Sequence, residues 1–238
     1  MRNRSRALAG VPSRATAFIL LCCALISGSH GEALAQQKTA QRQPKTATPP
    51  PVRPVPDGVM LRIIRAEDER RWDNDLSVLL FDKDGRVRER AALAAGRIGD
   101  ERAVASLVTL LQTDQEESVR AMAAFALGET ESVAGAASLA DAAQKARETS
   151  EVRARAVEAL GKIIAALPQA DEARGKTLGE VILKALDEEL RRGPRPNRDL
   201  VLLGLTAALR ARPNNAGATV AKFLSSTDAR VRADAANT

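Results

Sequence analysis

One pattern recurs three times in the middle of the chain. The copies begin at Val87, Val119 and Val152, 32 and 33 residues apart, and read VRERAALAAGRIGD, VRAMAAFALGETES and VRARAVEALGKIIA. A fixed period of this length is typical of solenoids, in which a short helical unit buries its apolar side only by stacking on the next unit. The repeat therefore predicts an all-α chain built as a stack.

Each copy has the spacing of an amphipathic helix. Small or apolar residues stand at positions 0, 4, 7, 8 and mostly 11, counted from the leading valine, and this spacing places them on one helical face. A polar break follows, and a second helical pattern precedes the next copy, as in Leu107, Leu110 and Leu111 before Val119. Each unit is therefore expected to be a helix pair.

Candidate helix caps precede the repeated valines. A side-chain oxygen at such a position can accept a hydrogen bond from an unpaired N–H of the first helical turn. The candidates are Asp84, Ser118, Ser150, and Thr227 or Asp228.

The copies resemble the HEAT-like repeat of phycobilisome-lyase type. The resemblance lies in a loop aspartate, Val-Arg, alanine at position 4 and Ala-Leu-Gly at positions 7 to 9. The resemblance implies a right-handed α-solenoid of about five stacked helix pairs over residues 58–238, the last pair incomplete. A copy led by Leu200 lacks the arginine, and about 15 extra residues precede it. They predict a longer helix and a loop that contains Pro194 and Pro196.

An arginine follows the leading valine in four copies. The resemblance implies that these pairs are structural and that each arginine contacts acidic loop groups such as Asp84 or Asp114, in its own or the neighbouring repeat. The alternative is a basic ladder that binds phosphates. The residues are Val87 and Arg88, Val119 and Arg120, Val152 and Arg153, and Val231 and Arg232.

Position 10 of the copies alternates in charge. Arg97, Glu129 and Lys162 occupy it. We expect neighbouring members of this row to form exposed ion pairs between repeats.

The N-terminal region has the pattern of an export signal. Residues 1–35 contain four arginines, an apolar run from Ala15 to Ser27 and a small-residue cleavage site that ends at Ala35. The run is short for a membrane span, although a retained anchor is the alternative. Residues 36–57 contain six prolines and no apolar period, which predicts a disordered linker. We expect an exported protein, periplasmic or secreted, with no membrane association after cleavage.

Catalytic and metal-binding side chains are scarce after residue 35. Both cysteines and the single histidine precede that residue, and the chain has no tyrosine. This removes thiolate and imidazole ligands and the common nucleophile systems. We therefore expect no catalytic, metal or cofactor site.

The net charge of +6 belongs to the N-terminal region. Of the 36 Lys and Arg residues, four lie in 1–35 and four in 36–57, which leaves 28 against 28 Asp and Glu in 58–238. Because binding to a nucleic-acid backbone needs clustered, uncompensated cations, a neutral body argues against a nucleic-acid partner.

The predicted partner surface is the side of each valine-led helix opposite its apolar stripe, at positions 2, 6 and 9. Small residues there, such as Gly96 and Gly128, would leave a shallow groove for a protein or peptide. The alternative is that adjacent helices partly cover its apolar members. The candidate partner-binding residues are Glu89, Leu93, Phe125 and Glu158.

Three functions compete. The first is a non-catalytic protein–protein interaction scaffold of the cell envelope, with its partner on the concave face. The second is the N-terminal repeat domain of a longer exported enzyme, such as a cyclophilin-like peptidyl-prolyl isomerase, because Thr238 falls inside a repeat. The third, a bilin lyase-like activity, is disfavoured by the export signal and the lack of His and Tyr.

Overall fold

The computed structural model describes residues 54–238, which belong to one compact unit spanning residues 51–238. The predicted signal peptide, 1–35, lies outside the described residues, as does the predicted linker up to residue 53. The predicted end of the linker is wrong, because Asp57 is the first residue of helix α1 and Pro56 is its N-cap. Residues 54–238 contain helices, turns and loops but no strand.

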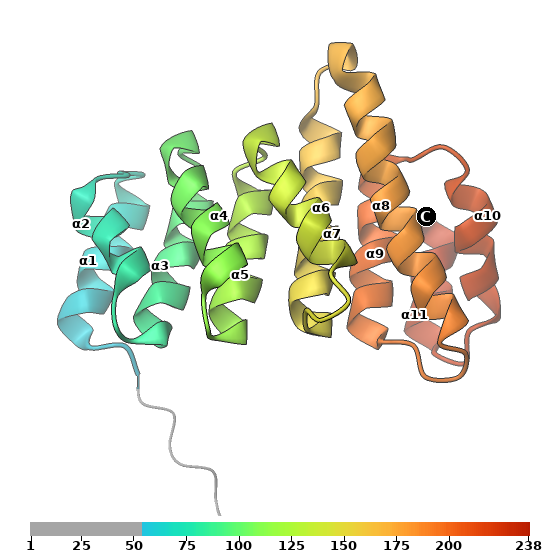
Figure 1. The fold of residues 1–238 in the computed structure, drawn as a ribbon, viewed down its shortest axis with the longest axis horizontal. Helices are drawn as coiled ribbons and strands as arrows, with labels where there is room; N and C mark the ends of the chain where they lie inside the picture. Colours follow the sequence, from blue (N-terminus) through green and yellow to red (C-terminus); the bar gives the residue numbers. More distant parts are fainter. Residues whose placement is uncertain (1–53) are drawn as a thin grey trace, which may run out of the picture. The chain divides into compact units, whose positions relative to one another are not determined.

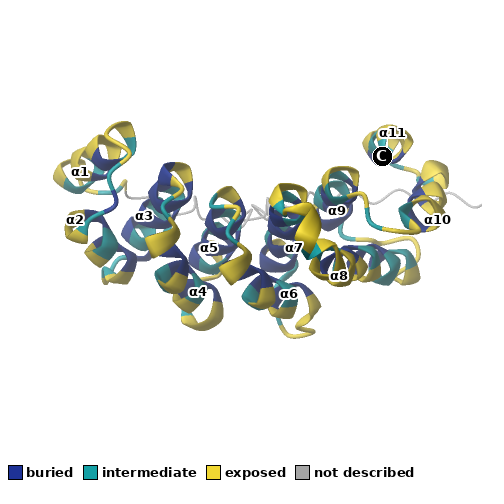
Figure 2. Cartoon of the chain, turned by 90° about the horizontal axis from the view of Figure 1, so that it is seen from above, coloured by how far each residue is buried: buried dark blue, intermediate teal, exposed yellow. Residues whose placement is uncertain are grey.

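The helices alternate between two layers along the chain (Figures 1 and 2). The first layer contains α1 (Asp57–Asp68), α3 (Gly85–Ile98), α5 (Glu117–Glu129), α7 (Ser150–Ala166), α9 (Arg198–Ala211) and α11 (Ala229–Asn237). The second contains α2 (Asn74–Ser77) with η1 (Val78–Phe81), α4 (Val104–Thr113), α6 (Ala136–Gln144), α8 (Glu172–Arg191), and α10 (Ala216–Val220) with η5 (Ala221–Ser225). The short turns η2 (Glu101–Ala103), η3 (Val133–Gly135) and η4 (Gln169–Asp171) lead into α4, α6 and α8. This arrangement is an α-solenoid of helix pairs.

The first-layer helices of the repeat have their N-caps at one common position, three residues before the leading apolar residue. Side chains there accept hydrogen bonds from backbone N–H groups in four helices: Asp84 in α3, Thr149 in α7, Asn197 in α9 and Asp228 in α11. The expected caps Ser118 and Ser150 are wrong, because both lie inside their helices. In α5 the N-cap is Glu116, whose side chain makes no capping bond.

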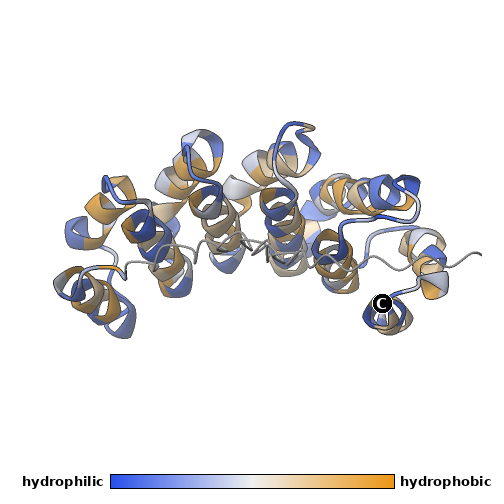
Figure 3. Cartoon of the chain, turned by 90° about the horizontal axis from the view of Figure 1, so that it is seen from below, coloured by the Kyte–Doolittle hydropathy of each residue, from blue (hydrophilic) through white to orange (hydrophobic). Residues whose placement is uncertain are grey.

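The core lies between the two layers and between successive first-layer helices. The leading residues Val87, Val119, Val152 and Leu200 are all buried there. Figure 3 shows hydrophobic residues gathered in the interior and hydrophilic ones on the outward surfaces and loops. Because alanine supplies many of the buried positions, each pair buries little area and depends on its neighbours.

A glycine at position 9 of α3, α5 and α7 brings each of these helices into close contact with the next first-layer helix. A Cβ on Gly96 would lie 2.7 Å from the Ala126 Cα, and one on Gly128 would lie 2.7 Å from the Ala159 Cα. The same relation joins α7 to α9, where a Cβ on Gly161 would lie 2.6 Å from the Cα of Ala207. The opposing atoms are backbone, so a larger residue has to push the helices apart.

The extra residues before the Leu200 copy lengthen the helices, as the sequence predicts. Helix α8 has 20 residues, whereas α4 has 10. The two prolines, Pro194 and Pro196, lie in the loop between α8 and α9.

We predict that Gly128→Ala destabilises the protein by about 1–3 kcal/mol, because its methyl group collides with the backbone of α7. The matched control is Gly217→Ala in α10, where an added Cβ meets nothing within 4 Å. This control is expected to be neutral or slightly stabilising, since alanine is the better helix former. Urea unfolding followed by circular dichroism measures both, and equal effects at the two sites would contradict the close contact.

Candidate functional site

A first-layer helix inside the stack leaves only one strip of its surface open. Helix α5, for example, contacts α3 and α7 in its own layer and α4 in the second layer. Positions −1, 3, 6 and 10 lie along the remaining strip, and we call these side chains on α3, α5, α7 and α9 the open face. They are Arg86, Arg90, Leu93, Arg97, Ser118, Met122, Phe125, Glu129, Glu151, Arg155, Glu158, Lys162, Asp199, Leu203, Thr206 and Arg210.

The predicted groove at positions 2, 6 and 9 is therefore wrong at position 9 and, in α5 and α7, at position 2. Position 9 holds the buried glycines that contact the next helix. At position 2, Ala121 and Ala154 are also buried. The prediction failed because it assumed one buried side per helix, whereas neighbours on both sides bury positions 2 and 9 as well.

The four predicted partner-binding residues do not form one cluster. Glu89, at position 2, is half-buried, and its carboxylate has no ion-pair or hydrogen-bond partner within residues 54–238. Leu93 is half-buried on the open face of the same helix, α3. Phe125 on α5 is half-buried, and Glu158 on α7 is only 9% exposed. Their role in binding stays a prediction.

Phe125 and Glu158 are joined by two cations of α7. The Lys162 ammonium lies 4.3 Å from the centre of the Phe125 ring, and the Arg155 guanidinium lies 5.6 Å from it. Both cations also pair with Glu158, at 3.2 Å for Lys162 and 2.9 Å for Arg155. The ring is thus covered by charges from the next repeat, as the sequence alternative allowed, and cation–π attraction adds to the contact between repeats.

Of the two ion pairs expected along position 10, one forms. Lys162 lies 2.6 Å from Glu129, which confirms the expected pair between α7 and α5. Arg97 instead lies 3.5 Å from Glu67 of α1. Arg90 binds the same Glu67 with two hydrogen bonds, of 2.7 and 2.6 Å.

The arginine after the leading valine connects successive loops. Arg88 donates two hydrogen bonds to Asp114 of the next repeat, at 2.7 and 2.8 Å, and another to the Asp82 carbonyl of its own loop. Arg120 likewise donates to Glu148 of the next repeat and to the Asp114 carbonyl.

The last two arginines vary this scheme. Arg153 pairs with Glu188 of α8 at 2.6 Å, and Arg232 donates to the backbone of its own loop. The expected contact with an acidic loop group, Asp84 or Asp114, is confirmed by the Arg88–Asp114 pair, whereas Asp84 pairs with Arg86. These guanidinium groups bind protein oxygens, which disfavours the phosphate-ladder alternative.

The arginine bonds between loops lower the pKa values of the carboxyl groups that accept them. Burial alone would raise the pKa of Asp114, but hydrogen bonds from Arg88 and from the backbone N–H of Glu116 outweigh it and lower the pKa. Burial alone would likewise raise the pKa of Glu148. Hydrogen bonds from Arg120 and from the backbone N–H of Thr149 outweigh burial and lower that pKa. Both carboxylates therefore stabilise the fold in their ionised form.

Several cavities open on the surface of the described residues, and two of them are lined in part by α7 and α9. The first, which we call the acidic groove, has a volume of about 640 Å³ and lies across the N-terminal ends of α5, α7 and α9. It is lined by Glu117, Ser150, Glu151, Ala154, Arg155, Asn197, Asp199, Leu202 and Leu203. Sequence reasoning missed it, because its walls come from three repeats.

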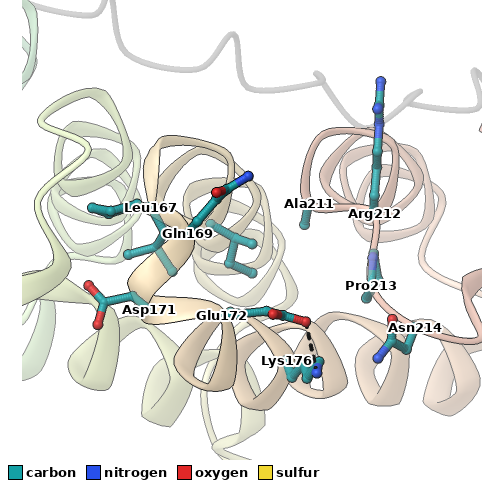
Figure 4. Close-up of a pocket in the computed structure, with 12 residues that line it drawn as sticks. Leu167, Gln169, Asp171, Glu172, Lys176, Ala211, Arg212, Pro213 and Asn214 are labelled. Atoms are coloured by element: carbon teal, nitrogen blue, oxygen red, sulfur yellow. Dashed lines mark ion pairs between the residues drawn. The ribbon is translucent and has the colours of Figure 1, made fainter.

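The second cavity, of about 700 Å³, lies where the end of α7, the start of α8 and the end of α9 meet (Figure 4). Leu167 and Pro213 provide apolar walls, and the Glu172 carboxylate lies 2.9 Å from the Lys176 ammonium. The hydrogen bond from Lys176 lowers the pKa of Glu172. A carboxyl group with a lowered pKa stays ionised at neutral pH and is a poor general acid there.

We predict that Asp114→Asn lowers the free energy of unfolding by about 1–3 kcal/mol at neutral pH, because it leaves the Arg88 guanidinium, 14% exposed, without its buried anion. The folded pKa of Asp114 lies below its ordinary value of 3.8, so the unfolded chain binds the proton first as the pH falls. The stabilisation is thus complete above that value and is lost as the pH falls through the folded pKa. Urea unfolding at neutral and acidic pH should show the gap between wild type and variant shrinking in acid, and a gap independent of pH would contradict this account.

Comparison with known families agrees with the repeat architecture. A family model described as HEAT repeats matches residues 68–128, which run from the end of α1 to α5. No curated protein matches the sequence. None of the helices within residues 54–238 combines the length and apolar character needed to cross a bilayer. HEAT repeats are commonly protein-interaction scaffolds and generally non-catalytic, and the match supports a HEAT-like repeat protein.

Proposed function

We propose that this chain is a non-catalytic protein-interaction scaffold of the cell envelope that holds a protein partner on the open face of its first layer. One observation carries the proposal: the open face places the half-buried apolar side chains Leu93, Met122 and Leu203, from α3, α5 and α9, among charged ones. The second layer does not cover this face. Apolar side chains with a polar surround are the usual composition of a protein-binding surface.

The way the open face is held supports the same function. Glycine contacts fix α3 against α5, α5 against α7 and α7 against α9, and arginine bonds join the loops at the starts of α3, α5 and α7. Side chains on such a frame are already ordered, so a partner loses less entropy by immobilising them. A row of ordered helices can therefore hold an extended partner over several repeats.

The envelope location rests on the N-terminal sequence. Arginines, an apolar run and the small residues around Ala35 have the order of a secretory signal. Cleavage after Ala35 would leave the proline-rich residues 36–53 ahead of the helical stack. The partner is then expected among exported or envelope proteins.

The test is capture of a partner by the tagged full-length protein from envelope extracts of its own cells, quantified by mass spectrometry. Leu93→Glu and Met122→Glu each place a charge among the apolar side chains of the open face and are expected to reduce capture at least about tenfold, equivalent to about 1.4 kcal/mol. The matched control is Ala137→Glu on the exposed surface of α6 in the second layer. It is expected to leave capture unchanged.

Thermal melting of all three variants checks that folding is intact. Melting of Leu93→Glu is expected to change little, because Leu93 is half-buried, whereas Met122 packs against the core from a half-buried position and Met122→Glu is expected to lower the melting temperature modestly. A partner that still binds both open-face variants as it binds wild type would contradict the proposed function.

A further inference from the structure

We propose that the acidic groove binds a basic segment of the partner protein, in which lysine or arginine residues flank an apolar side chain. This inference rests on the proposed function, since it specifies what part of the partner the scaffold holds. It follows from three observations on residues 54–238: carboxylates with no partner or only a distant one, cations that are already engaged, and an apolar floor.

The carboxylates come from three successive first-layer helices. Glu117 lies in the first turn of α5, Glu151 in that of α7 and Asp199 in that of α9. Glu117 and Glu151 are exposed and have no ion-pair or hydrogen-bond partner within residues 54–238. Asp199 has only Arg198, at the limiting distance of 4.0 Å.

The nearby cations are held elsewhere. Arg155, in the wall of the groove, pairs with Glu158 at 2.9 Å and lies over the Phe125 ring. Arg198 pairs with Asp228 of α11 at 2.6 Å. Among residues 54–238, the groove therefore keeps an excess of negative charge that no ion pair neutralises.

The N-terminal ends of helices favour acidic residues, because the helix dipole attracts negative charge. This preference accounts for acids in the first turns of α5, α7 and α9. It supplies no counter-charge, however, and a basic peptide would supply one to all three carboxylates. Like-charged groups gathered around a cavity attract an oppositely charged ligand more strongly than scattered ones do.

The floor of the groove is apolar. Ala154 is buried, and Leu202 and Leu203 are half-buried between the acidic groups. Neighbouring helices typically pack at about 8–10 Å, so three first-layer helices span about 20 Å. An extended peptide of about six residues, at about 3.3 Å per residue, has this length. An apolar side chain on the floor with basic side chains on either side matches this layout.

The test measures binding of a fluorescein-labelled peptide, Gly-Lys-Arg-Leu-Leu-Lys-Arg-Gly, to the full-length protein by fluorescence anisotropy. The groove variant is Glu151→Gln/Asp199→Asn, which keeps side-chain size and removes two charges. The matched control is Asp75→Asn/Glu180→Gln, which removes two exposed carboxylates away from the groove. Leu203→Ala, which shortens the floor, provides a second groove variant with no change in charge.

We expect wild type and the control double variant to bind alike, the charge variant to bind at least about tenfold more weakly, and Leu203→Ala to bind several-fold more weakly. Binding should weaken with added salt, and less steeply in the charge variant. The peptide Gly-Glu-Asp-Leu-Leu-Glu-Asp-Gly should not bind.

Three results would each overturn the inference: no binding of the basic peptide to wild type, equal weakening by the groove and control variants, or displacement of the peptide by spermine at equal charge concentration. The last would reveal a surface that attracts cations of any kind. The proposed function is tested separately, because Leu93 and Met122 lie outside the groove. If their variants lose the partner while the peptide does not bind, only the present inference fails.

Discussion

The stack depends on one close contact, the glycine at position 9 of a first-layer helix against the alanine at position 7 of the next. It occurs between α3 and α5, between α5 and α7, and between α7 and α9. At each contact the backbone of the next helix occupies the space that a side chain at the glycine position would fill. The two helix axes therefore lie closer together than packing of leucine against leucine would allow. Because these residues bury little apolar area themselves, each interface derives its strength from many short contacts along the helices.

That close contact decides which side chains remain available. A first-layer helix with neighbours on both sides keeps one strip for solvent, and the arginine bonds between loops hold the starts of the helices in register. The open face and the acidic groove lie on the surface that these neighbouring helices leave exposed to solvent. Their geometry is set by the spacing of the repeats rather than by any single loop.

Much of the fold could be predicted from the sequence because the same residues recur at the same helical positions. The approximate positions of α3, α5, α7 and α11 and the Lys162–Glu129 pair follow from the repeat, and the long α8 follows from the extra residues before Leu200. The caps Ser118 and Ser150 were misplaced, since several polar residues precede each helix and only the backbone geometry shows that the cap stands three residues before the valine.

The candidate site was less predictable. A single helical period identifies the core face but does not reveal that neighbours in the same layer bury Ala121 and Ala154. The groove is harder still, because Glu151 and Asp199 are distant in sequence and belong to repeats separated by an insertion. Partnerless carboxylates are visible only when every nearby cation has been located.

Contacts between successive first-layer helices are expected to couple the repeats into one cooperative stack. Native-state hydrogen exchange, measured by mass spectrometry, tests this directly. Helices α5, α7 and α9, with neighbours on both sides, should exchange slowest and at similar rates, and protection should decrease toward α1 and α11. Helix pairs that exchange independently of one another, or an α7 no better protected than α1, would contradict it.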